Sequence, residues 1–117
     1  MTYYDRYGNA CCYTDKTNHI YALDGKPLGY ILDNSVWNYG GRYLGQFKNS
    51  WIIDREGYYL FFSDESKGGP IKPIRKLTPL NSIQELRPIK SIREIPPIPP
   101  ITSLYWSETD INSFFLL

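Results

Sequence analysis

The sequence is poor in the side chains on which most catalytic and metal sites depend. It has one histidine, His19, and only two cysteines, the adjacent Cys11 and Cys12. A zinc site usually needs about four such ligands, and an acid–base pair would need a partner for His19 that the sequence does not suggest. No serine stands in a nucleophile-elbow motif, and no glycine-rich loop opens a helix. We therefore expect no enzyme activity, no catalytic residue, no bound metal and no cofactor.

The sequence also lacks a long apolar run and an excess of charge of one sign. No apolar stretch reaches the 18 residues of a membrane span, and the net charge is only +1. We therefore expect no membrane span and no nucleic-acid partner. The first residues lack the apolar core of a signal peptide, which favours a cytoplasmic protein by default; export to the cell surface or into a filament by a leaderless route is the alternative.

The two cysteines have a simple interpretation. Adjacent residues of a strand point to opposite faces, so Cys11 and Cys12 poorly suit a disulfide with each other. We interpret them as small apolar strand residues.

Four similar units, each centred on a glycine, occupy the first 64 residues. In each unit β-prone residues flank a turn, and apolar residues recur four and five positions before the glycine, as in Tyr3 and Tyr4 before Gly8. Each unit therefore predicts a β-hairpin. Asp24-Gly25 and Gly40-Gly41 suit two-residue type I′ turns, which would place residues such as Trp37 and Leu44 opposite each other, whereas the other two units suit a longer, bulged turn. The glycines are Gly8, Gly25, Gly41 and Gly57.

The four units and the remainder of the chain resemble the four-fold beta-flower proteins. The resemblance rests on YDRYGNA, YALDGKPLGYI, VWNYGGRYLGQF and WIIDREGYYLFF, and continues through GGP, a Pro-rich triplet tail and the ending YWSETDINSFF. It implies an all-β fold of four curved β-hairpins in a flower-like pseudo-fourfold arrangement. It implies no activity and no site residue. We divide the chain into a four-hairpin β domain over 1–68, an extended tail over 69–104 and an aromatic C-terminal anchor over 105–117.

The tail carries an isoleucine or leucine at every third position. This period fits neither an α-helix nor a strand, but it gives one straight apolar stripe on a polyproline II helix. Basic residues beside the stripe, such as Arg75 and Arg93, are expected to form a second, solvated stripe. A disordered linker and a strand-like or solenoid tail are the alternatives. The stripe consists of Ile71, Ile74, Leu77, Leu80, Ile83, Leu86, Ile89, Ile92, Ile95, Ile98, Ile101 and Leu104.

An apolar stripe of this length predicts a docking device. About 34 residues of polyproline II span on the order of 105 Å, far beyond the width of one small domain, so the tail must bend back or reach neighbouring subunits. We favour burial between chains. After Tyr105 the period ends, and Ser107 with Asp110 suggests the start of a short helix, with an irregular end as the alternative. Trp106, Phe114 and Phe115 are expected to anchor the tail, preferably in a neighbour.

The sequence supports two classes of function. The first is a non-enzymatic structural protein whose tail docks on other copies of the same chain and builds a homo-oligomer or filament; the twelve stripe residues with Trp106, Phe114 and Phe115 would form the interface. The alternative is a binding module whose aromatic hairpin face holds a glycan or protein ligand.

Overall fold

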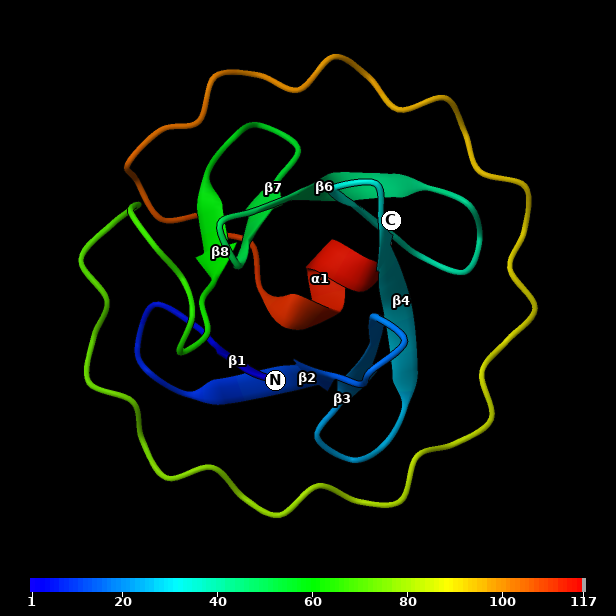
Figure 1. Ribbon diagram of the computed structural model, residues 1–117, viewed down its shortest axis with the longest axis horizontal. Helices are drawn as coiled ribbons and strands as arrows, with labels where there is room; N and C mark the ends of the chain where they lie inside the picture. The colour runs from blue at the N-terminus through cyan, green and yellow to red at the C-terminus, as the bar shows by residue number, and fades with distance from the viewer. Residues whose placement is uncertain (117) are drawn as a thin grey trace.

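The computed structural model describes residues 1–116 and shows an all-β domain with one short helix (Figure 1). Leu117, the last residue of the predicted anchor, lies outside the described residues. Each strand is short and rich in tyrosine, tryptophan and branched aliphatic residues, as expected for half-buried strands. The elements are β1 (Thr2–Tyr4), β2 (Ala10–Thr14), β3 (His19–Ala22), β4 (Pro27–Leu32), β5 (Ser35–Trp37), β6 (Tyr43–Lys48), β7 (Trp51–Asp54), β8 (Tyr59–Phe61) and α1 (Ile111–Phe115).

The eight strands form one antiparallel sheet in which every strand pairs with its neighbours in the sequence. The sheet curls until its two ends meet. There the Tyr4 N–H donates to the Phe62 carbonyl at 2.7 Å, and the Phe62 N–H donates to the Tyr4 carbonyl at 2.9 Å. This bridge removes much of the exposed edge that an open sheet would present. We call residues 1–66, which form this nearly closed sheet, the barrel.

All four predicted hairpins are present, and their four turns have the same hydrogen-bond pattern. In β3–β4 the Gly25 N–H donates to the Ala22 carbonyl, and the Ala22 N–H donates to the Lys26 carbonyl, which encloses a three-residue loop. The glycine has a positive φ, and neither Asp24 nor Gly40 does. The predicted type I′ turns at Asp24-Gly25 and Gly40-Gly41 are therefore wrong, because that turn needs two positive φ angles.

Type I′ geometry occurs instead between the hairpins. Asp33 and Asn34, which join β4 to β5, have φ angles of 52° and 61°, and Asn49 and Ser50, which join β6 to β7, have 51° and 65°. Asparagine and aspartate tolerate this region because their side chains form local hydrogen bonds. These paired positive φ angles therefore occur in two of the three connections between hairpins.

The three-residue loops also change the strand register. Each hairpin contains an irregularity, so that Trp37 lies opposite Tyr43 and not opposite Leu44 as predicted. The displaced Leu44 points into the barrel and is fully buried. Its counterpart Leu60 does the same in the fourth hairpin, so the bulge supplies an additional core residue.

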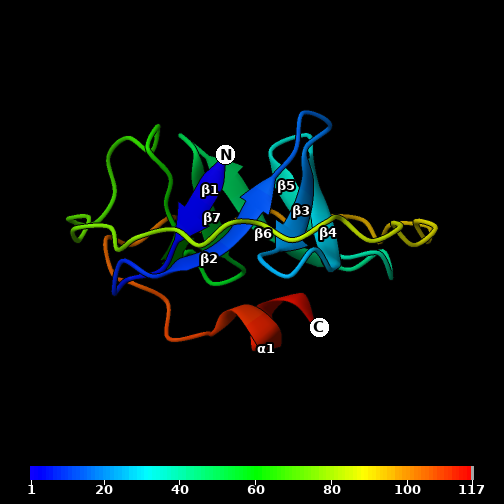
Figure 2. The ribbon, with the colours of Figure 1, turned by 90° about the horizontal axis from the view of Figure 1, so that it is seen from below.

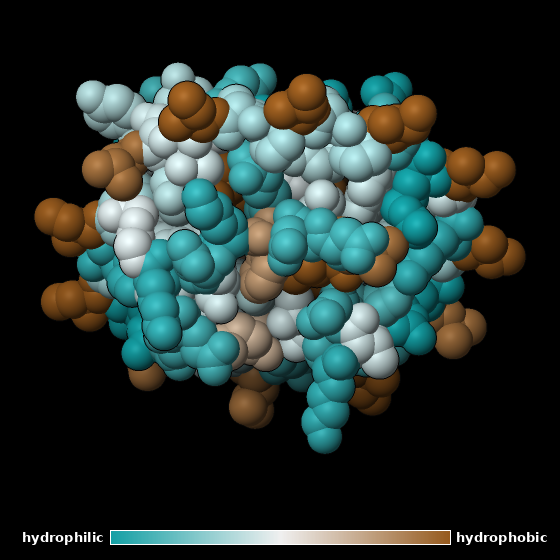
Figure 3. Space-filling view, turned by 45° about the horizontal axis from the view of Figure 1, so that its top comes forward, coloured by the Kyte–Doolittle hydropathy of each residue, from teal (hydrophilic) through white to brown (hydrophobic). Residues whose placement is uncertain are grey.

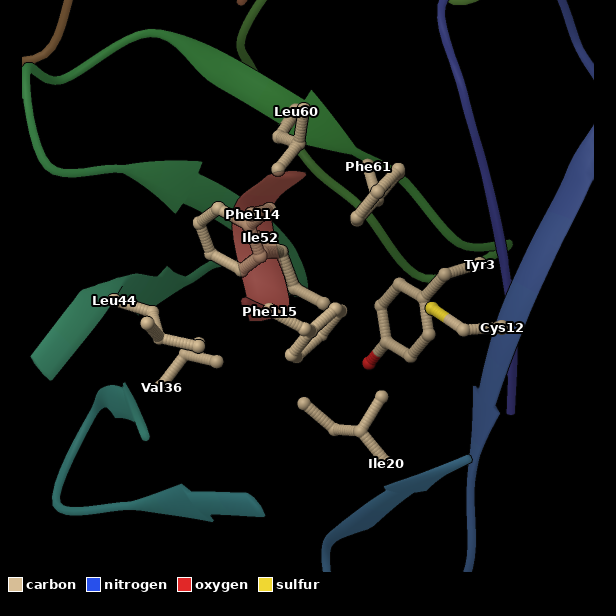
Figure 4. Packing of buried hydrophobic residues seen from close by; sticks show 10 residues of the cluster. All are labelled: Tyr3, Cys12, Ile20, Val36, Leu44, Ile52, Leu60, Phe61, Phe114 and Phe115. Carbon is tan, nitrogen blue, oxygen red and sulfur yellow. The ribbon is translucent and has the colours of Figure 1, made fainter. Parts of the chain in front are cut away.

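The core lies inside the barrel and is completed by the C-terminal helix (Figure 4). One residue from the first strand of each hairpin points inward, namely Tyr3, Ile20, Val36 and Ile52. Helix α1 covers one end of the barrel (Figure 2) and inserts Phe114 and Phe115 between them. The helix is capped by Asp110, whose Oδ1 accepts a hydrogen bond from the Ser113 N–H at 2.7 Å, and not by Ser107 as predicted.

The tail encircles the barrel as a single extended loop (Figure 1). Residues 70–103 contain no helix or strand. The molecule measures 36 Å along both of its longer axes. A circle of that diameter has a circumference close to the length predicted for the extended tail, so the tail is long enough to surround the barrel once. The tail therefore bends back and packs on its own barrel, which is one of the two paths that its length allowed; burial of its stripe between chains stays a prediction. We call residues 70–104 the belt.

Candidate functional site: an aliphatic ring held by the barrel

The belt is attached to the tips of the four hairpins at intervals of nine residues. The Glu85 N–H donates to the Gly25 carbonyl at 2.9 Å, and the Glu94 N–H donates to the Gly41 carbonyl at 2.8 Å. The same bond joins Lys76 to Gly8 and Ser103 to Gly57, each at 2.9 Å. Every ninth residue of the belt therefore binds the loop of the next hairpin, and these loops lie 16 or 17 residues apart in the sequence.

The loop glycines permit this contact in two ways. Gly41 has a φ of 86°, which L-residues rarely adopt, and a Cβ atom there would lie 2.1 Å from the Ile92 carbonyl oxygen. Gly25 has the same relationship to Ile83, with a φ of 93° and the same distance of 2.1 Å. A side chain at these positions would push the belt away from the barrel.

The inner side of the belt presents the residues that directly follow the aliphatic ones. Lys90 places its Nζ 4.2 Å from the centre of the Tyr30 ring, and Arg93 lies 5.7 Å from the Trp37 ring. Arg75 lies 5.5 Å from the Tyr4 ring. The basic column expected to be a solvated stripe therefore contacts the barrel, where cation–aromatic contacts contribute about 0.5–2 kcal/mol each.

Ion pairs add to these contacts along the inner side. Arg75 pairs with Asp64, and Arg87 lies 4.0 Å from Asp15. Arg87 also donates to the Thr17 hydroxyl at 3.0 Å. These groups are partly exposed, so each pair contributes little on its own. Their main effect is to orient the belt so that one side always faces the barrel.

The predicted stripe lies on the opposite side of the belt and faces outward. Eleven of its side chains are 92–98% exposed, and Leu104 is 70% exposed. Figure 3 shows apolar side chains that project separately from the edge of the molecule. We call these twelve residues the aliphatic ring. The ring places these exposed aliphatic side chains at every third residue along one side of the belt.

The three predicted anchor residues are separated from this ring. Phe114 and Phe115 are buried in the barrel core, and Trp106 packs against Trp51 and Phe62 on the side of the barrel. The expectation that they dock in a neighbouring chain is corrected, because their own barrel covers them. They hold the end of the belt, and only the aliphatic residues of the predicted interface face solvent.

The alternative binding face is also occupied. Tyr30, Trp37 and Tyr43 are almost completely buried, with the belt passing over them. These three aromatic side chains are therefore covered by the belt of their own chain and are not open to a ligand.

The single histidine lies in a packed aromatic cluster. His19 Nδ1 is 2.7 Å from the Tyr39 hydroxyl, and the two rings stack. Burial lowers the pKa of His19, and the nearby charges of Arg87 and Lys90 lower it further. Burial raises the pKa of Tyr39 to about 12. Both side chains are therefore neutral near pH 7, and the cluster acts as packing beneath the belt.

Both cysteines are strand residues, as the sequence indicates. Cys12 is fully buried in the core, Cys11 is half-buried, and neither forms a disulfide. Burial raises the pKa of the Cys11 thiol to about 12, so the thiolate that nucleophilic chemistry requires is scarce near neutral pH.

Sequence reasoning did not identify the residues that hold the belt. The signal was present as two matched periods, because Lys76, Glu85 and Glu94 recur every nine residues while the hairpin glycines recur every 16 or 17. Four repeats in the tail and four in the hairpin region would have suggested that the tail docks on the hairpins.

The chain matches the family described as 4-fold beta flower protein over residues 1–115. No curated protein and no solved structure matches it. The described part of the chain contains no helix that is long and apolar enough to cross a membrane.

Proposed function

This chain belongs to the 4-fold beta flower protein family, and its own belt presents the aliphatic ring on the rim of the molecule; we propose that it is a non-enzymatic structural protein that assembles with copies of itself. The single observation that carries the proposal is the exposure of eleven isoleucine and leucine side chains in one circle. Their common outward direction supports a polyproline II conformation of the belt, which repeats every three residues.

The spacing of the ring favours a second copy as the partner. Three residues of polyproline II advance about 9 Å, so a neighbouring side chain fits midway with a separation of about 4.5–5 Å, similar to that between side chains on paired strands. A second ring has the same spacing and can interdigitate with the first. The net charge of +1 also means that little repulsion opposes contact between copies.

The direction of the ring favours a flat layer over a stacked filament. The ring lies around the rim of a molecule that measures 36 × 36 × 23 Å, so neighbours at the rim cover it and neighbours stacked along the short axis do not. Two convex rims bury only a few residues, and burial of about 1.5–3 kcal/mol per side chain barely offsets the cost of association. Several contacts per molecule are therefore needed, and a layer supplies them.

A lipid bilayer is a poorer partner. Its hydrocarbon core is about 30 Å thick, whereas the ring is one side chain tall and the whole molecule is 23 Å along its short axis.

The proposal is tested by sedimentation equilibrium over a range of protein concentrations, with electron microscopy of the assembled material. We expect the mass of the natural chain to rise with concentration and single-layer sheets to appear. The double variant Ile83→Ser/Ile92→Ser should stay monomeric over a wider range, because both side chains face solvent and their loss leaves the barrel intact.

A matched control is Tyr7→Ser, which removes an exposed aromatic side chain outside the ring. It should assemble like the natural chain. A natural chain that stays monomeric at every concentration, or a double variant that assembles as well as the control, would contradict the proposal.

A further inference from the structure

The belt changes in composition between the attachments at Gly41 and Gly57. In the preceding interval Arg87 and Lys90 contact the barrel, and the Ser91 N–H donates to the Tyr39 carbonyl at 2.9 Å. Nine residues later these three positions are prolines, Pro96, Pro99 and Pro100. Pro100 has no N–H to repeat the bond of Ser91, and the other two prolines have no charge.

The barrel departs from its repeat at the same place. The position five residues after each loop glycine is aromatic in three hairpins, as in Tyr30, but it is Gln46 in the third. In the third hairpin Gln46 therefore takes the place of Tyr30, and Pro99 of the belt takes the place of Lys90. Gln46 Nε2 is shielded from solvent and has no hydrogen-bond partner among the described residues.

A hollow of 640 Å³ lies between this part of the belt and the barrel. Its volume falls in the range of small-molecule sites, which is about 300–1,000 Å³. A buried amide N–H without a partner is unfavourable, so the natural occupant of this hollow should supply an acceptor to Gln46. A proline-rich stretch of the belt, the absence of an aromatic ring and an unpartnered donor therefore coincide at this hollow.

The lining of the hollow indicates the chemistry of that ligand. Asp33 offers acceptors, and Asn34, Ser35 and Gln46 offer both donors and acceptors. Hydroxyl groups can satisfy such a mixed set because each one both donates and accepts. The prolines present apolar surface for the C–H face of a ring. The charges of Asp33 and Lys48 are opposite, which favours a neutral ligand.

We propose that the hollow between Gln46 and Pro96–Pro99 binds a neutral sugar ring, with Gln46 Nε2 donating to one of its hydroxyl groups. This site differs from the aromatic face considered from the sequence, because that face is covered by the belt. It is also independent of the aliphatic ring, so it stands whether or not the chain assembles.

The test is a titration of the full chain followed by ¹H–¹⁵N correlation spectra. The probes are D-glucose, D-galactose, D-mannose and N-acetyl-D-glucosamine, each added to about 100 mM, since single-ring sugars often bind with millimolar Kd. At least one sugar should shift the Gln46 side-chain amide and the backbone signals of Asp33 and Asn34 in a saturable way. The Gln46→Leu variant should bind it at least tenfold more weakly.

The control is Gln84→Leu, which removes an exposed glutamine of the belt and should leave binding unchanged. If none of the four sugars gives saturable shifts, water alone fills the hollow and the proposal is wrong. Equal binding by Gln46→Leu and the natural chain also overturns it. Saturable shifts with the peptide Ile-Pro-Pro-Ile-Pro-Pro-Ile but with no sugar would assign the site to a polypeptide instead.

Discussion

The Glu94 N–H donates to the Gly41 carbonyl at 2.8 Å, and this bond joins a belt residue to a hairpin 53 positions earlier in the chain. The Glu94 carboxylate also accepts from the Tyr43 N–H at 2.7 Å. One glutamate therefore pairs two backbone groups at the tip of the third hairpin, which places the belt at a defined height on the barrel.

We predict that Gly41→Ala destabilises the fold. Alanine at a positive φ costs about 1–2 kcal/mol, and its Cβ would also meet the Ile92 carbonyl oxygen at 2.1 Å. The free energy of unfolding from denaturant titration should fall by about 2 kcal/mol or more. Gly68→Ala separates the two causes, because Gly68 has a φ of 67° but no atom within 4 Å of the added Cβ.

The adjacent Gly40 gives a second control. Its φ is not positive, and the nearest atom to an added Cβ would be Asn38 Oδ1 at 3.3 Å, which is far less close than the 2.1 Å contact at Gly41. Gly40→Ala should therefore change stability little. Equal losses in Gly41→Ala and Gly68→Ala would show that the contact with the belt contributes nothing.

The contact between Lys90 and Tyr30 should contribute to holding the belt. Lys90→Met keeps an apolar chain of similar length but removes the charge above the ring, so it should lower stability by about 0.5–2 kcal/mol. Amide hydrogen exchange of Ser91, which donates to Tyr39, should become faster. Lys26→Met, on the loop of the second hairpin, is the matched control. Unchanged exchange at Ser91 would mean that the charge plays no part.

Phe114→Ala should destabilise the barrel itself. The ring is 1% exposed and packs against Phe61 and Phe115, so its loss should cost about 3–5 kcal/mol in the free energy of unfolding. Leu116→Ala, with an 82% exposed side chain, should have little effect. If Phe114→Ala weakened assembly but left the unfolding of the monomer unchanged, the helix would belong to a neighbour.

Stability should decrease as the pH falls below the ordinary pKa of histidine. The folded-state pKa of His19 is lowered by burial and by Arg87 and Lys90, so the unfolded chain binds more protons than the folded chain below about pH 6.5. The free energy of unfolding should therefore fall between about pH 7 and pH 5. His19→Gln should remove most of this dependence.

Asp15 titrates in a different range. Burial opposes ionisation, but hydrogen bonds from Thr17 and His19 outweigh it and lower the pKa of the Asp15 carboxyl. Its contribution is present above its ordinary pKa of about 3.9 and is lost only as the pH falls below that value. A pH dependence that persists unchanged in His19→Gln between about pH 5 and 7 would contradict the assignment to His19.

The sequence by itself determined the elements of this fold. Four glycine-centred units gave four hairpins because β-prone residues flank residues that accept positive φ. The triplet period determined that all the aliphatic residues of the tail share one side, since the period of a chain conformation is a local property. The tail composition, with proline in many triplets, excluded a helix or a central strand for the same reason.

Only the tertiary structure decided which side of the tail faces the protein. An apolar stripe is expected to be buried, yet the four hairpin tips offer carbonyl oxygens and aromatic faces, which attract N–H groups and cations and not aliphatic side chains. Lys90 and Arg93 therefore turn inward, and Ile89 and Ile92 turn outward. The choice between loop types was also tertiary, because the bulge that places Leu44 in the core is stabilised by packing across the barrel. The place of Phe114 depended on the path of the belt, which returns the end of the chain to the open end of its own barrel.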